Sequence, residues 1–570
     1  MPTVSAESES PVAGTRTVVS DPPRVLARGV GGWLRDLAVV ATLAAVTAVP
    51  WIDQRFVPLT WLALAAPLAA VGQLRGWRGE TLVLAWFATT LGIAFHWAPA
   101  VITKSLDTSP AFGLGMAVVM VLWDAARWSA PFWFIGRTVR NPLVAWLPAG
   151  LVAVVTEWLV PGIFPWKIGY TQIGWPVTVQ AADLFGPEVT TFVAFAHAGA
   201  IVWLWHAAEA FVRPAAGSPA GIGPWPAGIG PWSAVALAPL VVCAANLGYG
   251  LWAIDHWTTV AAAAPRIRAA VVQVNSALDD ATPLLQEQTR TICAAAGADD
   301  PLDIVIWPEC SGGSYDAALD CLADEKRVWA LSREPERGLR PLASPACPLL
   351  FGGKIFTGEP EKPRTLHQSA ILIDCAERIV GRYHKRHLMP FGEYVPGSSW
   401  LRDIKFWFPL DDEFHEGHEA TVLRVPGQAA LGVMLCYEDM VPSAARSLVR
   451  GGADVLVSLI NGAAFTNPLT LCQHRLLAQL RAVECRRSFI RCAATGETCL
   501  IDPVGRIEER LPLHVQDTLV VEAPRLESPT VYARTGPVFP PAAAATLGIG
   551  LGWPWLRRRQ SSGRSGRSQG

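Results

Sequence analysis

The hydrophobic positions of the chain follow two arrangements, and the change between them lies near residue 255. Before it, long apolar stretches follow one another with short polar gaps. A helix of about 20 apolar residues spans the ~30 Å hydrocarbon core of a bilayer. We therefore expect eight transmembrane helices, seven before the change and one near the C-terminus. Their approximate bounds are Trp33–Pro50, Val57–Leu74, Thr81–Val101, Ala111–Ile135, Pro142–Pro161, Val189–Phe211, Ser233–Ile254 and Val538–Leu556.

Between residues 266 and 526 the apolar runs are short and alternate with polar or turn-forming segments, a pattern typical of buried strands. One segment, Leu469–Arg487, has helical periodicity instead. Strands that alternate with helices predict an α/β domain. The predicted strands are Ile267–Val274, Leu302–Trp307, Leu349–Phe351, Ala430–Leu435, Ala453–Ile460, Phe489–Ala494 and Thr498–Ile501.

Composition supports a membrane part followed by a water-exposed part. Hydrophobic residues make up 51% of the chain and charged residues only 17%, whereas soluble domains carry about 25% charged residues. The formal net charge of -1 gives no basic field that would attract nucleic acid. The chain has no paired Cys-x-x-Cys clusters of the zinc type, and we expect neither a metal nor a cofactor. Its eleven cysteines are an odd number, so at least one lies outside any intrachain disulfide.

Arginine placement predicts the orientation, because cytoplasmic loops carry the excess of Lys and Arg. The opposite loops hold only Arg55, Lys104 and Lys167. Both termini are thus expected in the cytoplasm and residues 266–526 outside it. Residues 1–32 are expected to form a disordered tail without the core of a cleavable signal peptide, and residues 557–570 a basic tail. The arginines on the basic side are Arg16, Arg24, Arg28, Arg35, Arg75, Arg78, Arg137, Arg140, Arg213, Arg557, Arg558 and Arg559.

Three predicted strands end in residues that could do chemistry, since ligand sites in α/β sheets favour the carboxyl ends of strands. These residues are Glu309, Cys436 and Asn461, and Lys385 lies in a basic loop. Each has an ordinary explanation by itself: a strand-end Glu or a loop Lys is usually solvated, and most cysteines are small buried hydrophobes. Cys436 becomes a candidate nucleophile only if a base and an oxyanion stabiliser lie nearby.

The order of strand-end Glu, loop Lys and strand-end Cys resembles the carbon–nitrogen hydrolase (nitrilase) superfamily. Trp307-Pro308-Glu309 is similar to its first motif and Cys436-Tyr437-Glu438 to its third. Residues 385–396 resemble the version of the Lys motif in the apolipoprotein N-acyltransferase family. Residues 156–159, 164–166, 169–172 and 186–188 are similar to that family's loop between its fifth and sixth spans, and residues 532–536 to its segment before the last span. The resemblance implies a multi-span α-helical membrane domain and a nitrilase-type αββα sandwich outside the cytoplasm.

The resemblance also implies a reaction. Glu309 would be the general base and Cys436 the nucleophile, while Lys385 and the backbone N–H of Tyr437 would stabilise the oxyanion. The acyl donor would be a membrane phospholipid. The acceptor would be the α-amino group of the diacylglyceryl-cysteine that begins a lipoprotein. The enzyme would work as a monomer in a bacterial inner membrane, with residues 266–526 in the periplasm.

Three further residues are implied as supporting groups. In the family, acids that match Glu393 and Glu438 support the triad, although a loop salt bridge is nearly as good an explanation for Glu438. Tyr437 would line the path of the acyl chain or the headgroup.

The chain departs from the family pattern in three places. His367-Gln368-Ser369 stands where the family usually has aromatic-Asn-Ser. Asn461-Gly462-Ala463-Ala464-Phe465 replaces Asn-Asp-Ala-Trp-Phe, and Ala494-Thr495-Gly496 replaces Asn-Thr-Gly. These changes surround the triad, so they bear on substrate preference and rate more than on reaction type. Two alternatives stay open: a membrane-tethered amidase or nitrilase that passes its acyl group to water, and a catalytically silent scaffold for lipoprotein sorting.

Overall fold

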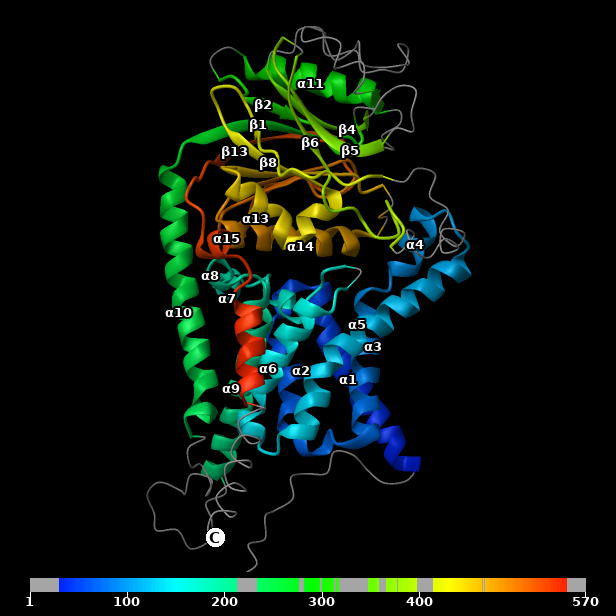
Figure 1. Ribbon diagram of the computed structural model, residues 1–570, viewed down its shortest axis with the longest axis vertical. Coiled ribbons are helices and arrows are strands. Elements are labelled where there is room, and N and C mark those ends of the chain that lie inside the picture. Colours follow the sequence, from blue (N-terminus) through cyan, green and yellow to red (C-terminus); the bar gives the residue numbers. More distant parts are fainter. Residues whose placement is uncertain are drawn as a thin grey trace, which may run out of the picture.

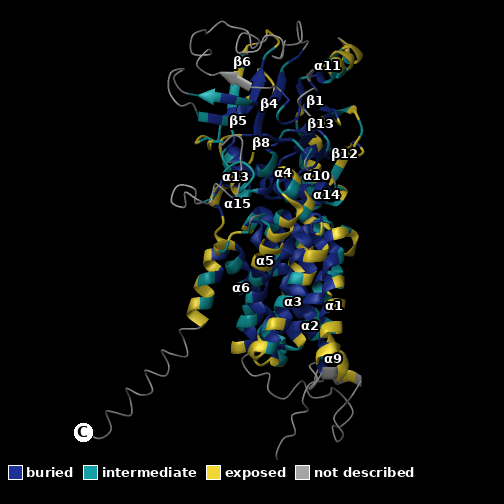
Figure 2. Ribbon diagram, turned by 90° about the vertical axis from the view of Figure 1, so that its right-hand side faces the viewer, coloured by how far each residue is buried: buried dark blue, intermediate teal, exposed yellow. Residues whose placement is uncertain are grey.

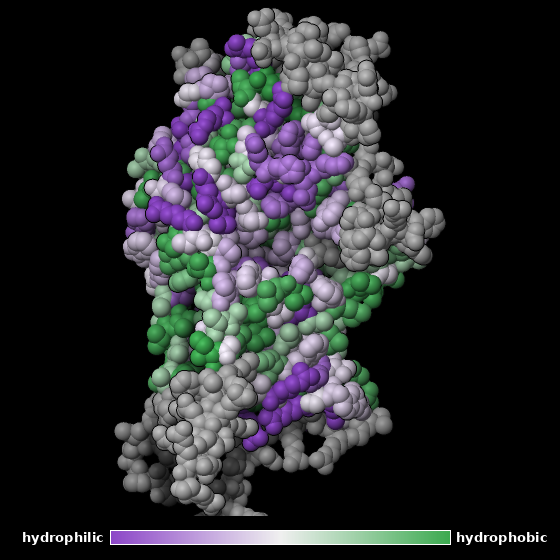
Figure 3. Space-filling model, in the orientation of Figure 1, coloured by the Kyte–Doolittle hydropathy of each residue, from purple (hydrophilic) through white to green (hydrophobic). Residues whose placement is uncertain are grey.

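The structure of the protein is a computed structural model in which a bundle of helices carries an α/β domain at one end (Figure 1). Figure 3 shows that the bundle presents a mainly hydrophobic surface in this view, whereas the α/β domain is more hydrophilic. The described residues are 30–162, 164–212, 233–275, 281–297, 300–311, 314–316, 347–357, 365–376, 378–396, 414–463, 465 and 467–550.

All seven apolar stretches before residue 255 are helical. Residues 539–550 are helical as well and overlap the eighth stretch. Proline at the first turn starts several of these helices, and the side chains of Ser109 and Asn141 cap two of them. The bundle helices are α1 (Val30–Ile52), α2 (Pro58–Ala69), α3 (Gly76–Ala94), α4 (Ala98–Ser105), α5 (Pro110–Thr138), α6 (Pro142–Leu159), α9 (Glu188–Val212) and α10 (Ser233–Ala263).

Five of the described helices are long and apolar enough to cross a membrane: α1, α5, α6, α9 and α10. The pair α3 and α4 makes a sixth if it counts as one span, although it is bent by 62°. Helix α2 has 12 residues, about 18 Å, and is shorter than the hydrocarbon core. The apolar helices mark a membrane protein, while the eight-span count and the orientation stay predictions.

Short helices close the end of the bundle that faces the α/β domain. They are η3 (Ile168–Gln172), α7 (Pro176–Val179) and α8 (Ala182–Phe185), and all three lie in the loop between α6 and α9. Most of their side chains are buried, so this loop is part of the packed structure and supports the domain above it.

Two sheets form the centre of the α/β domain. The first runs in the order β13-β1-β2-β4-β5-β6, with β3 beside β4, and the second in the order β12-β11-β10-β9-β8-β7. The first sheet contains β1 (Arg266–Gln273), β2 (Ile304–Ile306), β3 (Ser314–Asp316), β4 (Leu349–Thr357), β5 (Thr365–Ile373), β6 (Ile379–His384) and β13 (Asp517–Pro524). The second contains β7 (Leu423–Arg424), β8 (Ala430–Leu435), β9 (Val455–Ile460), β10 (Phe489–Ala493), β11 (Cys499–Ile501) and β12 (Ile507–Arg510).

The sheets and their helices stack as four layers. Helix α11 (Thr282–Ala296) covers the outer face of the first sheet, and α13 (Pro442–Arg450) and α14 (Pro468–Cys485) cover the second (Figure 1). Apolar side chains of both sheets meet in one buried cluster, and burial is greatest along this interface and inside the bundle (Figure 2). The predicted αββα sandwich is confirmed. Helices α13 and α14 also form the layer that faces the bundle.

Side chains of α14 and the following residues fasten the domain to the bundle. Gln473 donates to the backbone oxygens of Trp51, at 3.1 Å, and Ala94, at 3.0 Å, and accepts from the indole of Trp97. Arg486, directly after α14, donates to Asp183 of α8 at 2.7 and 2.9 Å. These contacts place the carboxyl ends of the central strands near the bundle surface.

Candidate active site

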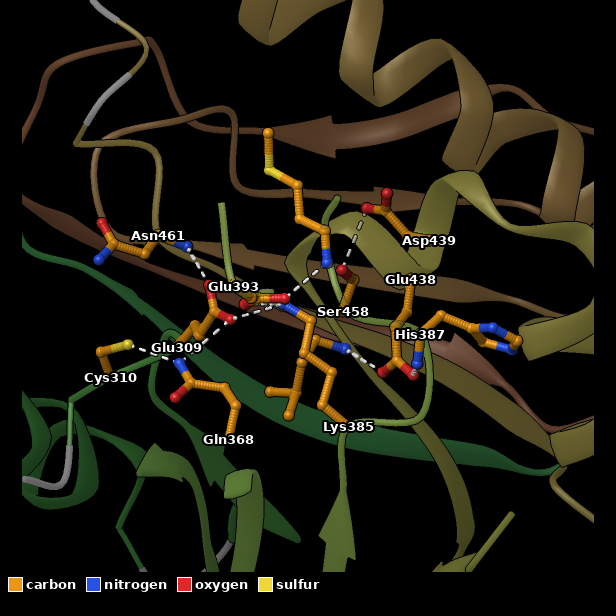
Figure 4. A network of polar contacts seen from close by, with 12 residues as sticks. Glu309, Cys310, Gln368, Lys385, His387, Glu393, Glu438, Asp439, Ser458 and Asn461 are labelled. Atoms are coloured by element: carbon orange, nitrogen blue, oxygen red, sulfur yellow. Dashed lines mark hydrogen bonds and ion pairs between the residues drawn. The ribbon is translucent and has the colours of Figure 1, made fainter. Parts of the chain in front are cut away.

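The two sheets bring the predicted strand-end residues together. Glu309 lies three residues after β2, Cys436 directly follows β8, and Asn461 directly follows β9. The Glu309 carboxylate accepts a hydrogen bond from the backbone N–H of Asn461 at 3.1 Å (Figure 4). Gly352 of β4 permits this approach, because a Cβ there would lie 2.7 Å from the Cα of Glu309. Only glycine leaves that room.

Lys385 follows β6 and is 1% exposed, although its loop is strongly basic. Its Nζ lies 2.6 Å from Oε1 of Glu393 and 3.4 Å from Oε1 of Glu309. The second oxygen of Glu393 accepts from the backbone N–H of Met389 at 2.8 Å (Figure 4). We call Glu309, Lys385 and Glu393 the Glu–Lys–Glu cluster. It holds two carboxylates against one ammonium group.

The backbone of Cys436 is unusual, since its φ of 46° lies in the left-handed region. Non-glycine residues seldom adopt this conformation, and such strain gathers at functional sites. Here it marks the sharp turn from β8 into the 3-10 helix η7 (Cys436–Met440). Nothing in the sequence pattern signalled this turn.

Burial and mutual charge set the protonation of these groups. Burial raises the pKa of Glu309, with the Lys385 ammonium opposing that shift and the Glu393 carboxylate adding to it. Burial lowers the pKa of Lys385, but the adjacent carboxylates outweigh it and hold this pKa well above its usual value. Burial and the charge of Glu309 also raise the pKa of Cys436 well above that of a free thiol. Lys385 is thus an ammonium group and Cys436 a thiol at neutral pH.

Glu438 connects the loop of Lys385 to the turn of Cys436. Its fully buried carboxylate accepts four hydrogen bonds, at 2.7 to 3.1 Å. The donors are the Tyr383 hydroxyl and the backbone N–H groups of Arg386, His387 and Leu435. Three of these four residues flank Lys385 and the fourth precedes Cys436, so one carboxylate fixes both segments relative to each other.

Tyr437 lies on the side of the turn that faces the bundle. It is half-buried and packs against the apolar cluster of the bundle together with Phe465 and Leu469. Burial raises the pKa of its hydroxyl to about 12. Tyr437 therefore lies between the domain and the bundle, and its role on a lipid path stays a prediction.

An apolar pocket opens beside the Glu–Lys–Glu cluster. One wall is the loop from Met389 to Gly392, which directly precedes Glu393. The other walls belong to the bundle, and nearly the whole lining is hydrophobic. They comprise Trp97, Ala98, Val101, Ile102, Ser105, Leu106, Met116, Met120 and Phe164.

One departure from the family pattern contacts the centre directly. The amide nitrogen of Gln368 donates to Oε1 of Glu309 at 3.3 Å and to the sulfur of Cys310 at 2.7 Å (Figure 4). Gly462 and Ala494 lie nearby on the backbone segments after β9 and β10, whereas Ala464 lies outside the described residues. Gln368 was noted only as a departure; its contact spans 59 residues, and no local pattern could reveal it.

In the described ranges no three His, Cys, Asp or Glu side chains gather as metal ligands. The described centre contains the Glu309 carboxylate as a candidate base, the Lys385 ammonium group and the Cys436 thiol. That combination suits acyl transfer through a covalent intermediate.

Comparison with known proteins identifies relatives of both parts of the chain. The carbon-nitrogen hydrolase family matches residues 268–527, and the apolipoprotein N-acyltransferase N-terminal domain matches residues 42–213. The apolipoprotein N-acyltransferase of Azotobacter vinelandii is 30% identical over 79% of this chain and 81% of its own. That of Geobacter metallireducens is 27% identical over 90% and 94%.

Among solved structures, Nit3 of Saccharomyces cerevisiae, a member of branch 10 of the nitrilase superfamily, is 18% identical. The match covers 48% of this chain and 96% of Nit3, with a TM-score of 0.33. The family assignment comes from the sequence relatives, which align across both the bundle and the α/β domain. The chain belongs to the apolipoprotein N-acyltransferase family and is an N-acyltransferase.

Proposed function

We propose that this enzyme transfers a fatty acyl chain from a membrane phospholipid to the α-amino group of a lipoprotein's N-terminal diacylglyceryl-cysteine. The chain passes through a thioester on Cys436. The observation that carries the proposal is the position of the Glu–Lys–Glu cluster, which lies between the strand ends of the α/β domain and an apolar pocket of the bundle. The groups proposed to react and the pocket proposed to hold the lipid therefore lie side by side.

In the first half-reaction Glu309 accepts the thiol proton as Cys436 attacks an ester carbonyl of the phospholipid. The raised pKa of Cys436 keeps the thiol protonated until substrate arrives, so proton removal accompanies attack. Lys385, with the N–H of Tyr437, stabilises the tetrahedral oxyanion. The lysophospholipid alkoxide then leaves, takes the proton from Glu309, and departs as an alcohol.

In the second half-reaction the lipoprotein amine attacks the thioester. Glu309 accepts a proton from the nitrogen as the carbon–nitrogen bond forms. The tetrahedral intermediate collapses, the carbon–sulfur bond breaks, and the thiolate regains its proton from Glu309. The products are an amide and free enzyme. Both half-reactions use the same base, which is possible because Glu309 ends each one as a carboxylate.

Supporting roles follow from the contacts. Glu393 holds the ammonium of Lys385 in place, and Glu438 fixes the loop of Lys385 against the turn of Cys436. Tyr437 lines the route between the bundle and the nucleophile.

The apolar pocket supports a lipid donor. Its walls join α4 and α5 to the loop that carries Glu393, so an acyl chain held there would reach toward Lys385. A dry, membrane-facing cleft also protects a thioester from water. We place the enzyme in a bacterial inner membrane as a monomer, with the α/β domain in the periplasm and both termini in the cytoplasm. The arginine asymmetry supports this placement.

The test uses purified full-length enzyme with a fluorescent phospholipid. Phospholipid alone should leave an acyl adduct on Cys436, detectable by mass spectrometry, and Cys436→Ala should show no adduct. A diacylglyceryl-cysteine peptide should convert the adduct to N-acylated peptide, and an N-acetylated peptide should not react. If the adduct decays to free fatty acid at one rate with and without peptide, the enzyme is a tethered hydrolase and the proposal fails.

A further inference from the structure

Two cysteines outside the catalytic centre lie in contact at the far side of the α/β domain. Cys293 belongs to α11 and Cys347 lies two residues before the start of β4. Their sulfur atoms are 3.9 Å apart, although the residues are 54 positions apart in sequence. Contact over such a separation is set by the fold and not by chain proximity.

Packing holds both residues where they are. Cys347 is buried and belongs to the apolar cluster under α11, together with Leu349 and Ile373. Cys293 packs against the same cluster from the helix and remains half-buried. The pair therefore has one sulfur inside the cluster and one that reagents can reach.

The chemistry of the two thiols suits oxidation. A hydrogen bond from Cys347 lowers the pKa of Cys293 to about 7, and that hydrogen bond raises the pKa of Cys347. The half-buried sulfur is thus the better thiolate, and a thiolate is the species that attacks a disulfide. The nucleophile Cys436 has the opposite properties, since its pKa is well above that of a free thiol.

We propose that Cys293 and Cys347 form a disulfide that clamps α11 to the first sheet. The two sulfur atoms, 3.9 Å apart, are already in contact, and they must approach to the S–S bond length of ~2.05 Å when the disulfide forms. This inference rests on the periplasmic placement proposed above, because disulfides persist in oxidising compartments.

The oxidant is a disulfide-bearing thiol oxidoreductase of that compartment. The Cys293 thiolate attacks the oxidant's disulfide, forming a mixed disulfide and releasing one oxidant thiol. The Cys347 thiolate then attacks the sulfur of Cys293 and expels the second oxidant thiol. The two cysteines lose two electrons and two protons in total, and the oxidant's disulfide gains them.

The oxidation explains how one chain keeps an active thiol in an oxidising space. The pair at α11 is converted to a stable crosslink through its half-buried member, Cys293. Cys436 is half-buried as well, but its raised pKa keeps it protonated, so it stays reduced for catalysis. The disulfide also closes a loop of more than 50 residues, which favours the folded domain.

The experiment lyses cells in N-ethylmaleimide with a denaturant, so that every free thiol can react, then isolates the full-length chain and digests it without reductant. Mass spectrometry should find one crosslinked peptide pair that contains Cys293 and Cys347, which disappears after reduction. In the Cys293→Ser variant, Cys347 should instead carry the maleimide. The variant should unfold at a temperature lower by several degrees while its acyl transfer per folded molecule stays unchanged.

Recovery of Cys293 and Cys347 as maleimide adducts from wild-type cells would overturn the inference, as would a bond from either residue to Cys321 or Cys375. Acyl transfer measured on a parallel preparation made without N-ethylmaleimide separates the two proposals. Full transfer with free thiols refutes the disulfide alone, while a crosslink without transfer to the lipopeptide refutes only the proposed function.

Discussion

Two buried charged clusters of this molecule differ in how completely their charges are matched. At the junction of bundle and α/β domain, Arg486 donates to Asp183 and Gln180, and Tyr249 donates to Asp183; we call these four residues the junction cluster. Its single carboxylate accepts from two nitrogens of the guanidinium and from the phenol. The Glu–Lys–Glu cluster holds two carboxylates against one lysine.

This difference in charge matching distinguishes the junction cluster, which stabilises the structure, from the Glu–Lys–Glu cluster, which can react. A buried charge that is fully paired contributes rigidity and has little tendency to exchange protons. Burial raises the pKa of Glu309, and the second carboxylate of the Glu–Lys–Glu cluster adds to this shift, which prepares Glu309 to accept a proton. We therefore expect changes in the junction cluster to affect stability, and changes in the Glu–Lys–Glu cluster to affect rate and its dependence on pH.

The largest effect is expected for Lys385→Met, which keeps volume but removes the only ammonium group of the cluster. Loss of an oxyanion stabiliser lowers rates by about 10²–10³-fold, and two unpaired carboxylates should add to the loss. The fall in rate is measured by using mass spectrometry to monitor acyl-enzyme formation over time. Arg378→Met, at an exposed pair with Asp374, is the matched control and should leave the rate unchanged. A normal rate in Lys385→Met would contradict the assignment.

Asp183→Asn should instead act on stability. Removing one partner of a buried ion pair costs about 3–5 kcal/mol, because the other charge stays buried. Denaturation in detergent should show that decrease in the free energy of unfolding, with acyl transfer per folded molecule preserved within a few-fold. The exposed pair of Asp53 and Arg55 offers the control, since Asp53→Asn should change stability by under about 1 kcal/mol. If Asp183→Asn lost acyl transfer without losing stability, the junction cluster would not have the purely structural role that we assign to it.

Glu393→Gln should shift the pH profile. Catalysis needs ionised Glu309, so activity is present above the pKa of Glu309 and is lost as pH falls through it. Glu393 raises this pKa, and its removal should move the acidic limb of kcat/KM to lower pH. The lost contact to Lys385 should also reduce the maximal rate by about tenfold. A limb that moves upward would show that Glu309 is not the titrating base.

Gln368→Leu should give the smallest effect, in the opposite direction. The Gln368 amide lowers the pKa of Glu309 by donating to its charged form. Without it the acidic limb should move to higher pH. The rate at neutral pH should fall less than about tenfold, since one hydrogen bond contributes about 1 kcal/mol. If the acidic limb moves in opposite directions in Glu393→Gln and Gln368→Leu, Glu309 is the group whose titration sets that limb. If it moves in the same direction in both, Glu309 is not that group.

Sequence patterns predicted an α/β domain and the strands that end near Glu309, Cys436 and Asn461, and these predictions rest on local periodicity, which the sheets preserve. The αββα layers came from the family resemblance. The place of Lys385 came only from a family resemblance, because a lysine in a basic loop has no local signal for burial. The contacts of Glu438 and Gln368 were not foreseen, since they join segments more than 50 residues apart.

The bend between α3 and α4 has a consequence for how the enzyme is made. The carbonyl of Ala94, at the end of α3, accepts its hydrogen bond from Gln473, 379 residues later in the chain. At about 5–20 residues per second, translation takes roughly 20–80 s to supply that partner. Until then another group or water must satisfy this carbonyl, or the helix pair stays straight. The bend is therefore completed only after residue 473 has been made and α14 has packed against the bundle.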